Sequence, residues 1–364
     1  MVHRGRASLT LLIENAEVER LLTVEACLDA LEVAFRDLAD GRAVNRPRSH
    51  SYTPLGDGHH YLFKSMDGGI PRWGVHAIRL SSDHTHEFSR DGRRRREKLP
   101  MAPGGRYVGL VLLFDIHTLE PLAIIQDGYL QRLRVGCTSG LAAKYLSRPE
   151  SAGVGLIGSG WQAGAQLLAL QKVRAVREYR AFSTDPERLR AFCADLSARL
   201  GQDVRPVASA REAVDGADIV ACATNSHDPV IDGDWLVPGQ HVGSVQSHEL
   251  DRRTLERAAL IAIRSRDAAT FHYLPGEAPV EAAEVKRLDD GLSAKMVELG
   301  DIIAGRGGRR TPQDITLFTG GGLGVSSGLG IQFCAVGYAV YQAAKAAGAG
   351  REIPTEWFLE TAKP

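Results

Sequence analysis

The feature that most constrains the fold is a glycine-rich turn that joins a short apolar run to a segment with helical character. Residues 154–157 are apolar, and they lead into Gly158-Ser159-Gly160-Trp161-Gln162-Ala163, a GxGxxA pattern. In such a turn the first glycine permits a tight bend, and the second lets the backbone approach a pyrophosphate. Ala163 allows the helix to pack closely on the strand, and the first N–H groups of the helix face the phosphates. The pattern therefore predicts that these six residues bind a dinucleotide.

Short apolar segments and helix-like segments alternate on both sides of this turn. The expected strands are residues 154–157, 178–182, 219–223, 242–245 and 260–263, and the expected helices are residues 162–173 and 186–200. This alternation is typical of a doubly wound parallel sheet with helices on both faces. We therefore expect an α/β protein with a Rossmann-type sheet, and a length of 364 residues leaves room for a second domain.

The segment after the second expected strand bears on the choice of coenzyme. An acidic residue at the end of that strand would bind the ribose 2′-hydroxyl of NAD and repel the 2′-phosphate of NADP. Here the sequence reads Ser183-Thr184-Asp185-Pro186-Glu187-Arg188. Ser183 tolerates a phosphate and Arg188 could pair with it, whereas Asp185 is close enough to bind the ribose. The segment slightly favours NADP over NAD, and it adds Ser183, Thr184 and Arg188 to the expected coenzyme site.

Charge and cysteine usage exclude several classes of protein. The 44 Lys and Arg residues balance the 44 Asp and Glu residues, so no overall field attracts nucleic acid or an anionic membrane. Five cysteines lie far apart without a CxxC pair, which favours reduced thiols over disulfides or a zinc site. Residues 315–344 carry no charge, but glycines crowd their first half, as in a loop followed by a helix rather than a membrane span. We expect a soluble, cytoplasmic protein whose partners are small molecules, not nucleic acid or membrane.

Outside the predicted Rossmann sheet, the sequence predicts a second domain of mixed α+β type. Helical spacing is found in residues 17–40 and 129–146, and strand-like runs lie within residues 59–82 and 106–126. Residues 319–328 form a glycine-rich loop that opens a further helix, and such a loop can bind an anion through backbone N–H groups. We expect this loop to line the active site, with close packing across a dimer as the alternative.

Two polar segments have both a functional and a structural interpretation. Arg93-Arg94-Arg95-Arg96 lies in a polar insertion, residues 89–100, for which a solvated loop is expected and an anion-binding site is the alternative. Asp83-His84-Thr85-His86-Glu87 contains two imidazoles and two carboxylates. On a strand only His84 and His86 would converge, so no metal site is expected there.

A set of short motifs extends along most of the chain. They are Asp127-Gly128, Leu133-Arg134, Thr138-Ser139, Ala142–Leu146, the turn at Gly158, Ala217–Val220, Thr224, Trp235–Gly239, Glu249–Asp251, Glu298–Asp301 and Ile315–Phe318. Together they resemble the ornithine cyclodeaminase and μ-crystallin family. The resemblance implies a homodimer in which a Rossmann domain, residues 131–318, is inserted into a substrate-binding and dimerisation domain, residues 1–130 and 319–364. It also adds Thr138 and Thr224 to the expected coenzyme site.

The resemblance assigns arginine side chains to the substrate carboxylate. Arg134 matches the family arginine that follows the Asp-Gly turn, and a planar guanidinium can hold a carboxylate through two hydrogen bonds. Arg48 resembles an earlier carboxylate-binding arginine of the family, although Arg46 competes for that position. Arg48 and Arg134 are therefore expected in the substrate site.

The sequence departs from the family where a lysine is usual, on the strand that here reads Gly74-Val75-His76-Ala77-Ile78-Arg79. One alignment register puts His76 in the lysine position and a looser register puts Arg79 there. A neutral imidazole could move a proton, whereas a guanidinium stays protonated and can only bind and polarise. Lys64, on the preceding expected strand, could supply a titratable amine instead. Lys64, His76, Arg79 and Arg134 are thus the candidate catalytic residues, with Arg79 also a candidate for substrate binding.

A second departure bears on the reaction. The family's acidic residue between His241 and Glu249 is missing, and that carboxylate is implicated in cyclodeamination. We therefore expect an NAD(P)-dependent oxidoreductase that acts on the C–N bond of an amino acid, imino acid or related amine. The alternatives are an NAD-dependent cyclodeaminase that releases ammonia and a nucleotide-binding protein with little turnover, like μ-crystallin.

Overall fold

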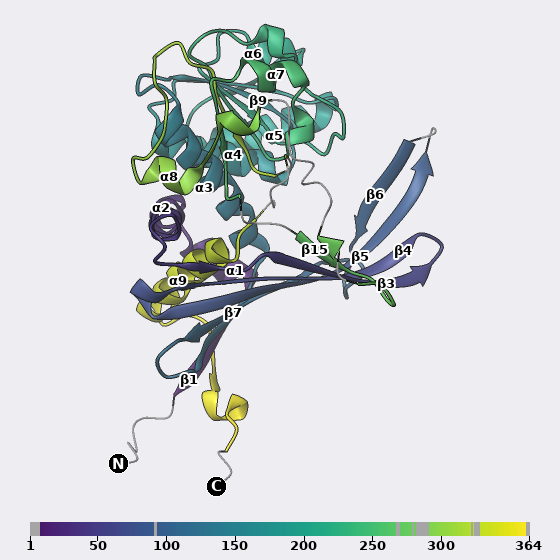
Figure 1. Ribbon diagram of the computed structural model, residues 1–364, viewed down its shortest axis with the longest axis vertical. Coiled ribbons are helices and arrows are strands. Elements are labelled where there is room, and N and C mark those ends of the chain that lie inside the picture. The colour runs from purple at the N-terminus through teal and green to yellow at the C-terminus, as the bar shows by residue number, and fades with distance from the viewer. Residues whose placement is uncertain are drawn as a thin grey trace.

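Two β-sheets, one in each half of the molecule, organise the computed structural model (Figure 1). The structure describes residues 8–90, 93–266, 270–278, 280–281, 291–321, 323 and 328–361, with the backbone alone for residues 89, 90, 93–96, 280 and 281. Helix α3 (Gly128–Leu146) packs against α4 (Trp161–Val173) of one half and against α2 (Val24–Ala39) and α9 (Gly330–Ala347) of the other. It therefore joins the two halves through side-chain packing as well as through the chain.

The sheet in the upper half of Figure 1 is parallel throughout its described strands, in the order β11-β10-β9-β12-β13-β18-β14-β17. The strands are β9 (Gly153–Ile157), β10 (Glu178–Phe182), β11 (Val204–Pro206), β12 (Ile219–Cys222), β13 (His241–Ser244), β14 (Leu260–Ile263), β17 (Met296–Glu298) and β18 (Thr316–Thr319). The strand order reverses between β9 and β12, and ligands of doubly wound sheets bind beyond the carboxyl ends of the strands at this point. The predicted fold class is confirmed.

Several helices of this half begin where a side chain accepts free backbone N–H groups. Besides α4 they are α5 (Pro186–Leu200), α6 (Ala210–Val214), α7 (Arg252–Arg257) and α8 (Leu299–Ile303). Asp185 caps α5 by accepting the N–H groups of Glu187 and Arg188 at 3.1 and 3.0 Å, and Pro186 occupies the first helical position. Gly201 ends the helix in a left-handed conformation.

The second sheet is mainly antiparallel and follows the order β16-β15-β3-β4-β5-β7-β8-β1-β19, with β2 on β4 and β6 on β5. Its strands are β1 (Leu9–Ile13), β2 (Val44–Asn45), β3 (Arg48–Gly56), β4 (His59–Ile70), β5 (Val75–Arg90), β6 (Arg93–Leu99), β7 (Val108–Asp115), β8 (Pro121–Gln126), β15 (Thr270–Tyr273), β16 (Val280–Glu281) and β19 (Arg351–Pro354). Short 3-10 helices complete the fold: η1 (Pro71–Trp73), η2 (Gly233–Trp235), η3 (Ser247–Glu249), η4 (Ser293–Lys295) and η5 (Thr355–Phe358).

Two features of this sheet differ from the sequence prediction. The arginine-rich segment, expected as a loop, forms β6 and pairs antiparallel with the end of β5. An antiparallel ribbon requires only paired backbone groups, so a charged sequence can adopt it. In addition, β15 and β16 lie within residues 131–318 but belong to the second sheet, where β15 pairs parallel with β3. Part of the segment expected to form the Rossmann domain therefore belongs to the second sheet.

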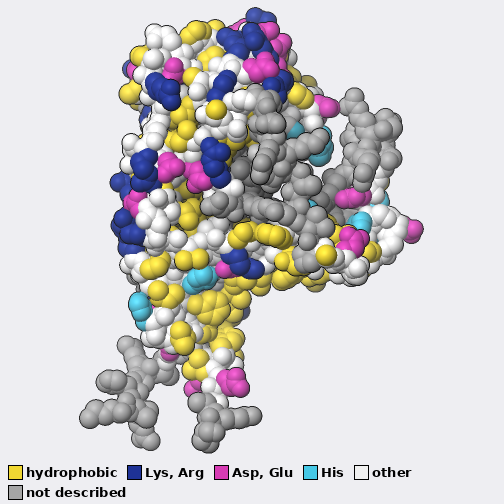
Figure 2. All heavy atoms as spheres, in the orientation of Figure 1, with side chains coloured by type: hydrophobic (Ala, Val, Ile, Leu, Met, Phe, Trp, Pro, Cys, Tyr) yellow, Lys and Arg dark blue, Asp and Glu magenta, His cyan; other side chains and the backbone are white. Residues whose placement is uncertain are grey.

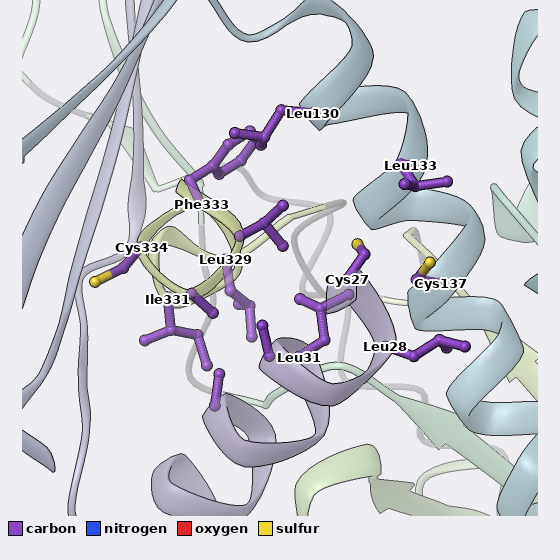
Figure 3. Packing of buried hydrophobic residues seen from close by; sticks show 14 of the residues in the cluster. Cys27, Leu28, Leu31, Leu130, Leu133, Cys137, Leu329, Ile331, Phe333 and Cys334 are labelled. Atoms are coloured by element: carbon purple, nitrogen blue, oxygen red, sulfur yellow. The ribbon is translucent and has the colours of Figure 1, made fainter. Parts of the chain in front are cut away.

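The single helix expected at residues 17–40 is divided into α1 (Asn15–Leu21) and α2, because Thr23 accepts the N–H of Ala26 at 3.1 Å and caps a new helix. Behind the sheet, apolar side chains of α2, α3 and the α9 segment point toward one another (Figure 3). Leu31, Leu133 and Phe333 are buried members of this core. Their packing fixes α3 and α9 behind the strands that carry the candidate site.

Further expectations from the sequence concern the glycine-rich segment, membrane-spanning helices and the cysteines. The glycine-rich segment after β18 is followed by helix α9, as expected, although residues 322 and 324–327, which include Ser326 and Ser327, lie outside the described residues. Within the described part of the chain, no helix has both the length and the apolar character needed to cross a membrane. The five cysteines are buried and free.

Candidate active site

Two cavities meet at the start of α4. The smaller, about 620 Å³, surrounds the glycine turn and is lined by Gly158, Ser183, Arg188 and Thr224 among other residues. The larger, about 980 Å³, lies between residues that follow strands of the parallel sheet and the strands β3, β4 and β5. Trp161 and Gln162 line both cavities. A ligand that extends past the end of α4 could therefore occupy both.

The glycine turn has the shape that a pyrophosphate requires. Gly158 has φ of +121°, and a Cβ at this position would lie 2.3 Å from the carbonyl oxygen of Ala223, so only glycine fits. At Gly160 a Cβ would meet a single neighbour within reach, the Arg188 Nη2 atom at 4.0 Å. The backbone there is open to a ligand, and the first N–H groups of α4 lie beside it. The residues present fit a dinucleotide.

The rim of the smaller cavity contains the residues that bear on the coenzyme. The Ser159 hydroxyl donates to the Ser183 hydroxyl at 3.0 Å, and Thr184 also lines the cavity. Asp185 is engaged as the cap of α5 by two backbone N–H groups. Arg188 is exposed and lies over Gly160. One oxygen of the Asp185 carboxylate is therefore engaged by the helix, while the Arg188 guanidinium faces the cavity that contains the glycine turn.

Thr224 and Thr138 form hydrogen bonds within the protein, to Glu249 and to the Arg134 carbonyl respectively. The Thr224 N–H and hydroxyl donate to Glu249 Oε1 at 2.6 and 2.8 Å, and the other oxygen of this buried carboxylate accepts the N–H groups of Val245 and Gln246 at 3.0 Å. Glu249 thus ties together the loops after β12 and β13, a role that the sequence motif alone did not reveal. The Thr138 hydroxyl is fully buried and donates to the Arg134 carbonyl at 2.7 Å, away from the residues that line the smaller cavity.

The larger cavity is built on one face of the second sheet. Because side chains alternate along a strand, Arg79, Ser81 and Asp83 of β5 share this face, and β4 places Lys64 opposite Ser81 on the same face. Arg48 of β3 also lines the cavity, and its Nη2 lies 4.0 Å from the sulfur of Met66. The strand register thus brings Arg48, Lys64 and Arg79 together.

Two buried arginines of this cavity, Arg79 and Arg134, lie over one aromatic ring. Arg79 donates to Asp127 at 2.6 Å, and Arg134 donates to the Gln332 side chain at 3.2 Å. Their guanidinium groups lie 5.4 and 4.7 Å from the centroid of Phe333. Burial, followed by the charges of neighbouring arginines, lowers the pKa of Arg134 well below its ordinary value and that of Arg48 to about 10. This part of the cavity is suited to bind an anion.

Lys64 is the titratable amine of the cavity. Its Nζ lies 2.9 Å from Asp83 Oδ2, and the other carboxylate oxygen is 2.5 Å from Nζ of Lys98. Burial lowers the pKa of Lys64 to about 8, although Asp83 acts in the opposite direction. The side chain can therefore both hold and release a proton near neutral pH.

Two of the sequence candidates lie outside the cavity. His76 is on the opposite face of β5, where its Nε2 is 3.3 Å from Asp67, and its side chain is 39% exposed. Arg46 pairs with the same carboxylate. Of Arg46 and Arg48, only Arg48 therefore lines the cavity. Of His76 and Arg79, the two candidates for the family's lysine position, only Arg79 lines it. The described residues contain no group of histidine, cysteine and acidic side chains that could hold a metal.

Sequence reasoning missed Arg264. It follows β14 directly, is 2% exposed and lies with its guanidinium 5.7 Å from the centroid of Phe318. Burial, and then the charge of Arg48, lowers the pKa of Arg264 to about 9. The available signal was an arginine immediately after the apolar run Leu260-Ile261-Ala262-Ile263, at the carboxyl end of an expected parallel strand.

Known proteins are similar to this chain along nearly its whole length. An alanine dehydrogenase of Archaeoglobus fulgidus is 28% identical over 351 residues, which cover 94% of this chain and 98% of that protein. The structure of Thermococcus litoralis Δ1-pyrroline-2-carboxylate reductase in complex with NADH and L-proline has a TM-score of 0.75 and 25% identity, covering 94% of this chain and all of that one. An archaeal alanine dehydrogenase dimer with bound NAD has a TM-score of 0.75 and 26% identity, covering 95% and 99% of the two chains.

The family itself is shown by a match to its sequence model. The model of the ornithine cyclodeaminase/mu-crystallin family matches residues 9–346, a range that contains both cavities and every residue assigned above to the candidate site. The parallel sheet, the glycine turn and the buried arginines all lie within this range. The chain belongs to the ornithine cyclodeaminase/mu-crystallin family.

Proposed function

We propose that this protein is an NAD(P)-dependent oxidoreductase that interconverts amino and imino acids. The observation that carries the proposal is the junction of a dinucleotide cavity with a cation-lined cavity at Trp161 and Gln162. The nicotinamide coenzyme, when bound, supplies the hydride that reduces the carbon of a C=N bond, while the nitrogen gains a proton. Relatives named as an alanine dehydrogenase and a Δ1-pyrroline-2-carboxylate reductase support this reaction class.

In this proposal Arg48 and Arg134 bind the substrate carboxylate. Arg134 is buried and Arg48 is half-buried, and hydrogen bonds between a guanidinium and a carboxylate strengthen where water is excluded. Arg79 is oriented by Asp127 and contributes positive charge beside them. The three residues would fix the substrate with its C–N bond facing the coenzyme cavity.

We propose that Lys64 transfers the proton to and from the substrate nitrogen. Among the sequence candidates, Lys64 lies in the cavity and titrates near neutral pH, whereas Arg79 is paired with Asp127 and His76 faces away from the cavity. Asp83 holds the amine in place at 2.9 Å. The Lys64 ammonium would donate to the nitrogen in the reductive direction, and the neutral amine would accept that proton in the oxidative direction.

For the coenzyme we propose a preference for NADP over NAD. Solved relatives were obtained with NADH and with NAD, which supports a nicotinamide coenzyme in general. The preference for the 2′-phosphate rests on the smaller cavity of this chain. Asp185 uses one carboxylate oxygen to cap α5, whereas Ser183 and Arg188 offer a hydroxyl and a cation to the phosphate.

We also propose that the protein forms a homodimer, as the archaeal alanine dehydrogenase does. Apolar side chains gather at the lower end of the molecule, near β1 and the C-terminal segment (Figure 2). Among the exposed ones are Leu9, Trp357, Phe358 and Leu359. Surfaces of this kind are typical of protein interfaces. Light scattering on the purified protein should give twice the mass of one chain, and a monomeric mass would contradict the proposal.

The function is tested by following nicotinamide absorbance. The purified protein is mixed with NADPH or NADH and either a cyclic imino acid or a 2-oxo acid together with ammonia or an amine. We expect coenzyme oxidation matched by formation of one amino acid per coenzyme. Ammonia release from a diamino acid without net coenzyme oxidation would indicate a cyclodeaminase and contradict the proposal. Tight coenzyme binding without turnover of any substrate would contradict it in favour of a binding protein.

A further inference from the structure

The larger cavity contains a buried cation that the proposed carboxylate site does not use. Arg264 is 2% exposed, and its Nε and Nη1 atoms make no hydrogen bond to the residues that the structure describes. Its only described aromatic contact is Phe318. A buried guanidinium without a counter-charge is unfavourable in a protein unless a ligand supplies the charge. Arg264 lines the cavity, so such a ligand could reach it.

The carboxylates of this cavity are engaged elsewhere. Asp127 accepts the hydrogen bond of Arg79 at 2.6 Å, and Asp83 is shared by Lys64 and Lys98. Glu14, the remaining acidic residue in the described lining, caps α1 as part of a capping box. The described lining carries more cations than these three acidic residues can neutralise: Arg48, Lys64, Arg79, Lys98, Arg106, Arg134 and Arg264. The cavity therefore favours a ligand with more than one negative charge.

Three arginines of the cavity, Arg48, Arg134 and Arg264, fall into two groups along the glycine-rich loop. A Cβ on Gly328 would lie 3.0 Å from Nη1 of Arg134 and 3.1 Å from Nη2 of Arg48. A Cβ on Gly320 would lie 2.9 Å from Nη2 of Arg264. Glycine at these two positions lets the backbone approach the guanidinium groups, so the two described ends of the loop lie against two different sets of guanidinium groups in one cavity.

The two groups nevertheless line the same cavity, so one ligand could contact both. The charge of Arg264 lowers the pKa of Arg134, and the charge of Arg48 lowers that of Arg264. Such mutual repulsion between buried cations is relieved when an anion binds to each. A substrate that carries a single carboxylate would neutralise the Arg48 and Arg134 group and leave Arg264 without a counter-charge.

We propose that Arg264 binds a second anionic group of the substrate, and that the preferred substrate is an imino acid with two anionic groups. The proposal rests on the proposed function for its reaction, while the binding of the second anion can be measured separately. An imine of this chemistry has two sources: a dicarboxylic 2-oxo acid with ammonia, or a monocarboxylic 2-oxo acid with an amino acid. Arg264 would then determine specificity without exchanging a proton.

The kinetic test compares three kinds of imine at fixed coenzyme concentration. Two are the dianionic imines above, which distinguish the two sources, and the third is a monocarboxylic 2-oxo acid with ammonia. We expect kcat/KM for one dianionic imine to exceed that of the monoanionic imine by about 10- to 100-fold, the range of one charge-assisted interaction. Arg264→Met keeps the apolar stem, removes the charge and should abolish this preference without changing the KM for coenzyme.

Arg266→Met is the matched control, because Arg266 lies on the same segment but is exposed and donates to the Met296 carbonyl. It should keep the preference. Equal kcat/KM values for dianionic and monoanionic imines in the wild-type protein would overturn the proposal. So would an Arg264→Met variant that retains the preference.

A binding measurement separates this proposal from the redox function. Succinate and glutarate, which cannot react, should raise the melting temperature of the wild-type protein and of Arg266→Met more than acetate or butyrate does. The additional shift should disappear in Arg264→Met, whose own melting temperature without ligand should be unchanged or higher because an uncompensated buried charge is gone. Equal shifts in all three proteins would overturn the proposal. An Arg264-dependent shift in a protein that reduces no imine would support the anion site and contradict the redox function instead.

Discussion

Lys64 lies where its charged and neutral forms have similar free energies near neutral pH. Burial favours the neutral amine, and the Asp83 carboxylate at 2.9 Å favours the ammonium. The balance places the pKa of Lys64 at about 8. A group with such a pKa can donate and accept a proton at comparable rates, which is the property that a reversible dehydrogenase requires.

The role of Lys64 predicts the pH dependence of the reaction. If the ammonium donates the proton, kcat/KM for imine reduction should fall as pH rises through about 8, because the neutral amine has no proton to give. Lys64→Met should lower kcat by about 100- to 10,000-fold and remove this limb. In Asp83→Asn the limb should move to lower pH, since the carboxylate that raises the pKa of Lys64 is lost. The pH dependence of kcat/KM, measured for the wild-type protein and both variants, checks these expectations. An unchanged fall in kcat/KM above about pH 8 in Lys64→Met would exclude Lys64 as the donor.

The proposed roles of Ser183 and Arg188 predict how substitutions at these positions change the coenzyme preference. Arg188→Ala should raise the KM for NADPH by about tenfold and leave the KM for NADH nearly unchanged, because only NADPH carries the 2′-phosphate. Ser183→Asp should favour NADH further by repelling the phosphate and accepting hydrogen bonds from the ribose. Arg190, exposed on the same helix but absent from the described lining of the cavity, gives the control Arg190→Ala. Equal loss of both coenzymes in Arg188→Ala would contradict the assignment.

The sequence could identify the types of residue in the candidate site but not all of their positions. His76 and Arg79 both fit the family's lysine position, and only the strand register shows that Arg79 faces the cavity while His76 faces Asp67. Arg264 had a local signal in its place after an apolar strand, but its convergence with Arg48 and Arg134 in one cavity could not be predicted, because those residues come from distant parts of the chain. Such convergence is decided by tertiary structure, which local spacing does not encode.

At the level of elements, the turn between β9 and α4 combines two requirements in one short segment. Gly158 is needed for the conformation of the turn, since a side chain would collide with the Ala223 carbonyl. Gly160 has free space around it, so glycine there is needed for the ligand rather than for the fold. The two positions should therefore respond differently to the same substitution.

We predict that Gly158→Ala lowers both stability and coenzyme affinity, whereas Gly160→Ala lowers coenzyme affinity alone. The first substitution imposes strain of about 1–3 kcal/mol at a positive φ and displaces the loop after β12. The second leaves the fold intact but holds the pyrophosphate away from the backbone. Thermal melting and fluorescence titration with NADPH measure the two effects. Equal destabilisation by both variants would contradict this division.

Elements with a strong local pattern were predictable, and others were not. The expected strands at 178–182 and 260–263 have the same bounds as β10 and β14, because apolar residues bounded by turns define them. The break between α1 and α2 was missed, since the capping bond of Thr23 is a local detail within a continuous apolar pattern. The hairpin of β5 and β6 was missed because its charged sequence carries no apolar alternation.

At the level of the whole molecule, the two halves share a continuous apolar core. The cluster around Leu31 and Phe333 also includes Ala262 of β14 and Phe318 of β18, which belong to the parallel sheet. The contacts of α3 with α4, α2 and α9 add to this connection. Separate unfolding of either half would therefore expose apolar surface that the other half normally covers.

We predict a single cooperative unfolding transition for both halves, with the coenzyme stabilising the whole molecule. At 100 times its Kd, NADPH should add about 2.7 kcal/mol to the free energy of unfolding, and the entire transition should move to higher temperature. Differential scanning calorimetry measures this directly. Two resolved transitions, of which only one responds to NADPH, would show that the halves unfold independently.

The strand β15 has a consequence for how the substrate cleft can open. It leaves the nucleotide-binding half shortly after Arg264, and Thr270 pairs in register with Arg48 at the start of β3. Backbone hydrogen bonds between β15 and β3 hold this margin of the cleft to the second sheet, and the chain runs from Arg264 of the other half to the same margin. A rotation that widens the cleft would then displace this margin least, so Arg48 and Arg264, which we propose to bind anions, would stay near the axis.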